Sequence, residues 1–127
     1  MRPNVRASRL LVLLAIAVAA LAVTACSATL EAPPVDVSYR DSLVGIGKII
    51  RLTNSGAEPL SALEVRIENP NGDVKNHPIA SLAGGSTLEL GWKKLDGFQV
   101  ELGAQVAVRA EGFVLPLKAQ LTASEPD

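Results

Sequence analysis

The stretch Leu63-Glu64-Val65-Arg66-Ile67-Glu68 decides the fold of this chain. Apolar and charged side chains alternate along it without a break, and this period of two places each kind on its own face of a β-strand. The charged face meets water, whereas the apolar face must be buried against other apolar side chains. The stretch therefore predicts a strand that is buried on one side, as is common in antiparallel sheets.

Similar patterns recur on both sides of this strand. They occupy Val35–Arg40, Leu43–Asn54, Val74–Ile79, Leu88–Trp92, Phe98–Leu102, Val106–Glu111 and Phe113–Leu121. Pro78 lacks a backbone N–H, so it places its strand at a sheet edge. Turn sequences rich in glycine, asparagine and proline separate the segments. After residue 25, no long stretch has the 3.6-residue period of an amphipathic helix.

These patterns predict an all-β fold. We expect a single antiparallel sandwich of seven to eight short strands over residues 35–122, followed by a frayed tail at 123–127. Apolar residues that alternate with charged or small ones should face the core: Leu63, Val65, Ile67, Leu88, Leu90, Trp92, Val106 and Val108. Trp92 shares its strand face with Leu88 and Leu90, which favours burial over a role as an exposed platform for a sugar.

The first 25 residues differ from the rest of the chain. Met1–Arg9 is short and basic, and Leu10–Val23 is an uninterrupted run of 14 apolar residues. As a helix this run spans about 21 Å, which is short of the roughly 30 Å hydrocarbon core of a bilayer. Its length and flanks favour a signal-peptide helix within residues 1–25, and a permanent membrane-anchor helix is the alternative.

The apolar run ends in Val23-Thr24-Ala25-Cys26. This stretch resembles the lipobox of bacterial lipoproteins, in which an aliphatic residue and small residues precede a cysteine. The resemblance implies that a lipoprotein signal peptidase cuts between Ala25 and Cys26 and that the Cys26 thiol carries diacylglycerol. The alternative is ordinary signal cleavage that leaves Cys26 as a free thiol, which would be a liability in an oxidising compartment.

Residues 26–34 follow as a tether that ends in Pro33-Pro34, which favours extended backbone. Stable anchoring needs more than one acyl chain, and lipid on a processed Cys26 would meet this requirement. By resemblance to Gram-negative lipoproteins, Ser27 after the cysteine implies export to the outer membrane. We therefore expect a lipid-anchored protein of the bacterial cell envelope, facing the periplasm if the cell is Gram-negative.

Three phrases of the sequence link one strand to the next through a glycine-containing turn. They are Leu52–Leu60, Leu82–Leu88 and Leu102–Val106. Together they resemble small immunoglobulin-like or fibronectin-type-III-like modules of bacterial envelope proteins. The resemblance spans about Val35–Leu121 and implies a fold rather than an activity. The Cys–Trp–Cys arrangement of antibody domains is absent from the sequence.

Composition limits the partners and cofactors that this chain can use. It has 12 basic and 13 acidic residues, and three of the basic ones, Arg2, Arg6 and Arg9, lie in the N-terminal segment. The remainder is mildly acidic, which disfavours binding to nucleic-acid phosphates. The single cysteine excludes an internal disulfide framework and a multi-cysteine zinc site. We therefore expect no nucleic-acid partner, no metal and no cofactor.

Few motifs point to catalysis. His77 is the only histidine, and we interpret it as a solvated residue of an edge strand rather than as a general base. Asn69–Asp73 superficially resembles the start of a calcium loop but lacks its ligand spacing, so a turn is favoured. Gly45–Lys48 lacks the spacing of a phosphate loop and is interpreted as part of a strand. Several acids alternate outward, as on solvated strand faces: Glu64, Glu68, Glu89 and Glu101. We predict no catalytic residue and no enzymatic activity.

These observations lead to one function hypothesis and two alternatives. We expect a lipid-anchored, non-enzymatic module that binds or supports another component of the envelope, either a protein or a glycan. The first alternative is a module dedicated to glycan or peptidoglycan, which needs an exposed aromatic side chain on a flat face. The second is a periplasmic inhibitor or assembly accessory that pairs an exposed edge strand with its partner.

Overall fold

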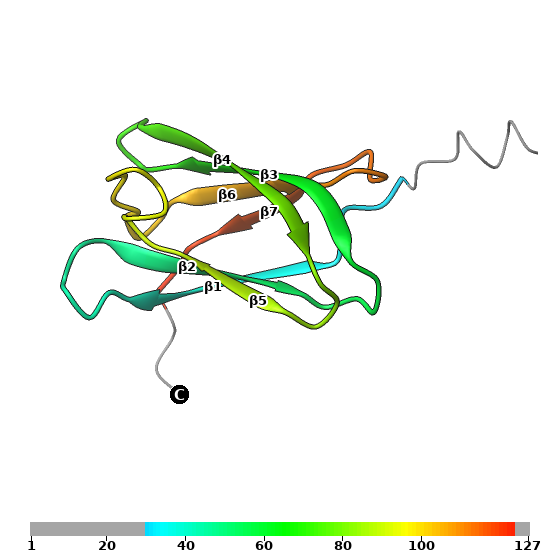
Figure 1. Cartoon of the computed structure of the whole chain (residues 1–127). Coiled ribbons are helices and arrows are strands. Elements are labelled where there is room, and N and C mark those ends of the chain that lie inside the picture. The colour runs from blue at the N-terminus through cyan, green and yellow to red at the C-terminus, as the bar shows by residue number, and fades with distance from the viewer. Residues whose placement is uncertain (1–29, 124–127) are drawn as a thin grey trace, which may run out of the picture.

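A computed structural model describes residues 30–123 of the chain (Figure 1). The predicted signal peptide, the tether residues up to 29 and the tail residues 124–127 lie outside the described residues. The described part contains seven strands and no helix: β1 (Val35–Asp41), β2 (Lys48–Asn54), β3 (Leu60–Glu68), β4 (Val74–Leu82), β5 (Thr87–Leu90), β6 (Gln105–Arg109) and β7 (Leu117–Gln120). The all-β prediction is confirmed.

Two antiparallel sheets form the sandwich. One has the strand order β1-β2-β5 and the other the order β4-β3-β6-β7, and Figure 1 shows them as two layers. In immunoglobulin-like sandwiches the first, second and fifth strands share one sheet and the third, sixth and seventh share the other, as they do here. β4 differs from the constant-type arrangement, because it pairs with β3 and lies at the predicted edge.

One hydrophobic core lies between the sheets. Both sheets contribute to it, and the prediction of an inward side chain is confirmed for Leu63, Val65, Ile67, Leu90, Val106 and Val108. Leu88 is half-buried against this core. Within the described part of the chain, the buried apolar residues lie between residues 33 and 121. The described segment therefore has a core of its own, which is the requirement for a domain that folds independently.

The structure shortens several of the predicted strands. Leu88–Trp92 is a strand only as far as Leu90, and Phe113–Leu121 is a strand only over Leu117–Gln120. The apolar run Leu43–Asn54 does not become a strand until Lys48, because its first residues form the turn between β1 and β2. Gly45–Lys48, interpreted above as part of a strand, belongs mostly to this turn. Phe98–Leu102 contributes only one bridge, between Val100 and Lys48, so it does not form an eighth strand.

A local change of backbone direction lets β3 cover one end of the core. Leu60 and Leu63 are both buried although they are three residues apart, which a regular alternation does not permit. Ala62 between them has a left-handed φ of 49°. This interrupts the alternation, so that Leu63 faces the same side of the sheet as Leu60. In the paired strand β4, Ile79 and Leu82 are likewise both buried. The two strands therefore bend together over the core.

A buried asparagine joins two connections at the end of the sandwich where the described chain begins. The Asn54 side chain is fully buried. Its Nδ2 donates to the backbone oxygens of Glu58 (2.8 Å) and Leu82 (3.0 Å), and its Oδ1 accepts from the Gly56 N–H (2.9 Å). Since both ends of the amide are bonded, burial of this polar group costs little. Asn54 thus holds the β2–β3 connection against the end of β4.

The same two connections also touch directly. A Cβ on Gly84 would lie 2.3 Å from the backbone oxygen of Ala57 and 2.9 Å from that of Gly56. Only glycine allows this approach of two backbones. The β2–β3 and β4–β5 connections are therefore locked together by backbone packing as well as by hydrogen bonds.

Candidate functional site

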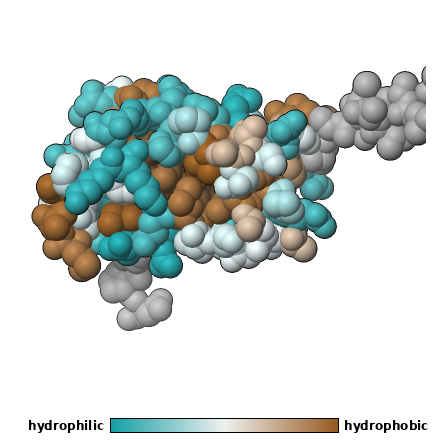
Figure 2. All heavy atoms as spheres, in the orientation of Figure 1, coloured by the Kyte–Doolittle hydropathy of each residue, from teal (hydrophilic) through white to brown (hydrophobic). Residues whose placement is uncertain are grey.

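The turn between β1 and β2 exposes large apolar side chains. Leu43 is 95% exposed, and its neighbour Val44 is 68% exposed. The Ser42 backbone oxygen accepts from the Gly45 N–H, and the Ser42 Oγ accepts from the Val44 N–H. Gly45 and Gly47 have left-handed φ values of 73° and 66°, which reverse the chain before β2 begins. Leu43 and Val44 therefore lie at the apex, where Figure 2 shows apolar surface at this end of the domain.

A groove of about 580 Å³ lies beside this apex. Its apolar lining includes Ile46 and Ile49 from the hairpin and Trp92 from the turn after β5. Charged side chains from β1, β5 and the same turn complete its rim. We call the following set the hairpin-tip surface: Leu43, Val44, Ile46, Ile49 and Trp92, with the cations Arg40, Lys93 and Lys94.

The prediction that Trp92 faces the core is wrong. β5 ends at Leu90, and the chain turns at Gly91, whose carbonyl oxygen accepts a hydrogen bond from the Leu95 N–H (3.1 Å). Because the strand stops, the alternation of period two no longer applies to the residues beyond it. Leu95 fills the core and is fully buried, whereas Trp92 is only partly buried and lines the groove.

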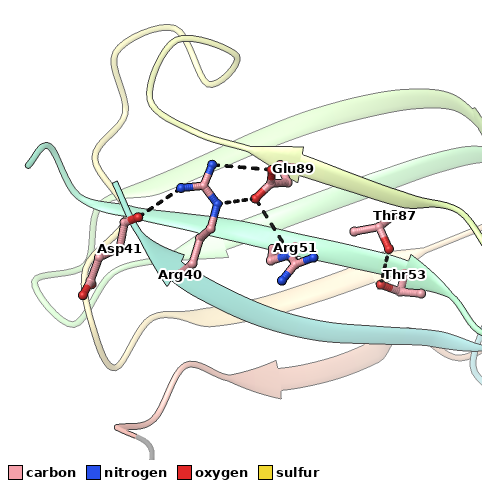
Figure 3. Close-up of polar contacts among 6 residues, drawn as sticks. All are labelled: Arg40, Asp41, Arg51, Thr53, Thr87 and Glu89. Carbon is pink, nitrogen blue, oxygen red and sulfur yellow. Dashed lines mark hydrogen bonds and ion pairs between the residues drawn. The ribbon is translucent and has the colours of Figure 1, made fainter. Parts of the chain in front are cut away.

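Three charged side chains link β1, β2 and β5 on the outer face of the three-stranded sheet (Figure 3). The Arg40 Nε lies 2.5 Å from the Glu89 Oε2, and the Arg51 Nε lies 3.8 Å from the same oxygen. The hydrogen bond from Arg40 is the main reason why the pKa of Glu89 is lowered, and the same bond raises the pKa of Arg40. Glu89 is the only acid among the residues that line the groove, and two guanidinium groups offset its charge.

The remaining cations of the hairpin-tip surface are exposed. Both Lys93 and Lys94 are exposed to solvent, and the Lys93 Nζ lies 5.8 Å from the centre of the Trp92 ring, within cation–π range. At the base of the hairpin, Asp41 is paired with Lys48. The groove therefore has an excess of positive charge, although the net charge of the whole chain is −1.

The structure places the other predicted motifs away from this surface. His77 is partly buried within β4, opposite Val65 of β3. In the Asn69–Asp73 turn, Asn71 and Asp73 bond to each other through two contacts. Among residues 30–123, no three histidine, cysteine or acidic side chains gather as a metal site would require.

Sequence reasoning missed the residues that give the site its character. Arg40 and Glu89 are 49 residues apart, and only the strand order β1-β2-β5 brings them within reach of each other. The exposure of Leu43 and Val44 had a signal, because two nearby glycines mark a turn. The apolar side chains of the same run favour a strand, and this pattern hides the turn.

The predicted cleavage and lipidation residues, Ala25 and Cys26, lie outside the described residues. No helix within residues 30–123 has the length and hydropathy needed to cross a bilayer. Comparisons with protein-family models, curated proteins and solved structures find no match for the chain. Its function must therefore be inferred from its own residues.

Proposed function

We propose that the protein is a lipid-anchored, non-enzymatic lipoprotein of the bacterial envelope that binds another envelope component through the hairpin-tip surface. The observation that carries this proposal is the 95% and 68% exposure of Leu43 and Val44. Apolar surface gains about 25 cal/mol per Å² when it leaves water, and these side chains do not realise that gain within the sandwich. Exposed apolar surface with a polar rim is typical of interaction sites.

The lipid anchor is supported by the basic start of the chain, the apolar run and the lipobox-like Val23-Thr24-Ala25-Cys26. In a Gram-negative cell, Ser27 would direct the processed protein to the outer membrane. Mass spectrometry of protein from native membranes should show a species that lacks residues 1–25 and carries acyl mass on Cys26. A soluble species with an unmodified Cys26 terminus would contradict the anchor.

Binding rather than catalysis agrees with the charges of the site. A general acid or base that works near neutral pH needs a pKa close to 7. Arg40 and Arg51 shift the pKa of Glu89 in the opposite direction, to below its ordinary range. A broad hydrolase panel, with and without divalent metals, should therefore read background. Turnover that disappears in Glu89→Gln or His77→Ala would contradict the non-enzymatic assignment.

Photo-crosslinking in native membranes tests whether the hairpin-tip surface binds. Leu43 is replaced by a photoreactive benzoylphenylalanine in the full chain, and Val114 is replaced in the matched control. Val114 is also exposed, at 50%, but lies in the connection between β6 and β7. We expect adducts at position 43 that are weak or absent at position 114. Equal labelling at both positions would show that the hairpin-tip surface has no special partner.

A glycan is a second candidate ligand, because Trp92 is partly exposed in the groove instead of being buried. An aromatic face beside Arg40 and Glu89 offers stacking and hydrogen bonds to one sugar ring. Titration with soluble peptidoglycan fragments, followed by the fluorescence of the single tryptophan, tests this candidate. Saturable quenching that is lost in Arg40→Ala would support it, and no change at millimolar fragment would remove it.

Edge-strand pairing has less support from the structure. The longest edge strand, β4, contains Pro78 and the charged Lys75. The edge strands β5 and β7 have only four residues each. The edge strand β1 has a charged residue near each of its ends, Asp36 and Arg40. Short strands, charges and proline are the features that discourage pairing with another chain.

A further inference from the structure

We propose that the hairpin-tip surface docks on an anionic phospholipid membrane. Leu43 and Val44 enter the boundary of the acyl region, while Arg40, Lys93 and Lys94 contact the headgroup phosphates. This inference rests on the proposed function, because it names the ligand of the same surface. It follows from the shape, the charge and the position of that surface.

The shape of the apex suits a fluid apolar phase. Leu43 and Val44 project from a turn, with 95% and 68% of their surfaces in water. A protruding pair of aliphatic side chains can be covered by lipid without a preformed pocket in a partner. Ile46 and Ile49 continue the apolar surface from the apex toward the sheet, so insertion does not stop at a single residue.

The charge of the rim suits anionic headgroups. Lys93 and Lys94 are exposed, and Arg40 offsets the charge of Glu89, the only acid among the residues that line the groove. Basic residues close to an anionic bilayer are attracted to its negative surface potential. The surface has apolar residues at its tip and cations behind them. This order matches a bilayer, in which the acyl chains lie deeper than the phosphates.

Trp92 lies between the apolar residues of the apex and the cations of the rim. It lines the groove with the apolar hairpin residues, while the Lys93 ammonium lies 5.8 Å from its ring centre. Tryptophan is enriched at the interface between acyl chains and headgroups, because its ring is apolar and its N–H is polar. Trp92 is also the only tryptophan in the chain, so it reports directly on contact with lipid.

The position of the apex allows docking on the same leaflet as the proposed lipid anchor. The hairpin apex and the start of the described chain lie at opposite ends of the sandwich (Figure 1). The seven residues of β1 span about 23 Å. Because Pro33 is buried against the domain, the tether can extend over residues 26–32, which span about 22 Å. The domain can therefore lie along the membrane, held at one end by lipid and at the other by the apex.

Binding to vesicles tests the proposal without the anchor. The segment from Leu30 to Asp127 contains the whole described core, and its cooperative melting is checked first. It is mixed with vesicles of phosphatidylethanolamine and phosphatidylglycerol, or of phosphatidylcholine alone. We expect co-sedimentation and a blue shift of Trp92 fluorescence with the anionic vesicles only. The binding should weaken as salt is raised, because salt screens the contacts with phosphate.

Two variants should lose this binding and a third should keep it. Leu43→Ser/Val44→Ser should weaken it at least tenfold through loss of apolar insertion. Lys93→Gln/Lys94→Gln should weaken it by about thirtyfold, as expected for two basic residues near an anionic surface. Val114→Ser/Leu115→Ser is the matched control, because these residues are 50% and 52% exposed in the β6–β7 connection. Its affinity should stay within twofold of the parent protein.

Three results would overturn the proposal: no binding to the anionic vesicles, equal binding to both kinds of vesicle, or equal loss in the control variant. The crosslinking experiment separates this failure from failure of the proposed function. Protein or glycan adducts at position 43 without vesicle binding would leave the binding module intact and reject the membrane as its ligand. Absence of both adducts and vesicle binding would reject the two proposals together.

Discussion

The two connections that flank β2 show opposite arrangements of polar and apolar groups. In the β2–β3 connection, the polar side chain of Asn54 is fully buried and bonds to the backbones of two connections. In the β1–β2 turn, the apolar side chain of Leu43 is 95% exposed. The β2–β3 connection is fixed by buried hydrogen bonds. The β1–β2 turn leaves apolar surface in water, where it adds little to stability and is free to bind.

The largest effect on this comparison should come from Gly84→Ala, because Gly84 packs against the β2–β3 connection. The added methyl would lie 2.3 Å from the Ala57 backbone oxygen, and backbone cannot move aside as a flexible side chain does. We expect a loss of about 3 kcal/mol or more in the free energy of unfolding, measured with urea. Gly91→Ala is the control, because its methyl would meet only Ile49 at 3.5 Å. Similar losses in both variants would contradict the locked packing.

The next largest effects on the free energy of unfolding should come from the β5–β6 connection, where a buried residue should matter more than a partly exposed one. Leu95→Ala empties a fully buried site and should cost about 3 kcal/mol. Trp92→Ala removes a larger side chain that is only partly buried, and should cost about 1 kcal/mol. Melting temperatures of the two variants, compared with the parent protein, check this order. A larger loss of stability in Trp92→Ala than in Leu95→Ala would mean that Trp92 is part of the core.

The third effect should come from Asn54→Ala, which should lower the free energy of unfolding by about 2 kcal/mol. The substitution leaves the carbonyl of Leu82 and the N–H of Gly56 without the bonds that Asn54 gives them, and unpaired buried groups carry a desolvation cost. Asn71→Ala is the matched control, because this exposed asparagine bonds only within its own turn. Urea unfolding of Asn71→Ala should match the parent within about 0.5 kcal/mol. Equal stability of the two variants would mean that the buried amide contributes nothing.

The sequence predicts the strands better than the connections, for physical reasons. Period-two alternation identifies residues such as Leu63 and Val106 as buried, because a strand has only two faces. It fails at Trp92, where the strand stops after Leu90 and the alternation no longer describes the backbone. It also misses Asn54, since the sequence Asn54-Ser55-Gly56 indicates a turn but not that the asparagine amide is buried. Long-range pairs such as Arg40 with Glu89 depend on strand order, which no local pattern contains.

The smallest effect should come from the ion pair beside the groove. Arg40 and Arg51 lower the pKa of Glu89 in the folded protein, so this carboxylate adds stability above its unfolded pKa, near 4.5. That stability is lost as the pH falls through the lower folded value. Glu89→Gln should therefore melt slightly below the parent at pH 7 and at the same temperature near pH 2. The difference at pH 7 should shrink in high salt, and a gap that persists in acid would contradict this account.

The central claim is that the hairpin tip serves binding and the rest of the sandwich serves stability. Urea unfolding of Leu43→Ser/Val44→Ser tests it most directly. Because these side chains are 95% and 68% exposed, the free energy of unfolding should stay within about 0.5 kcal/mol of the parent value. A loss of about 2 kcal/mol or more would show that the two residues support the fold, and would contradict the claim that their exposure exists for a ligand.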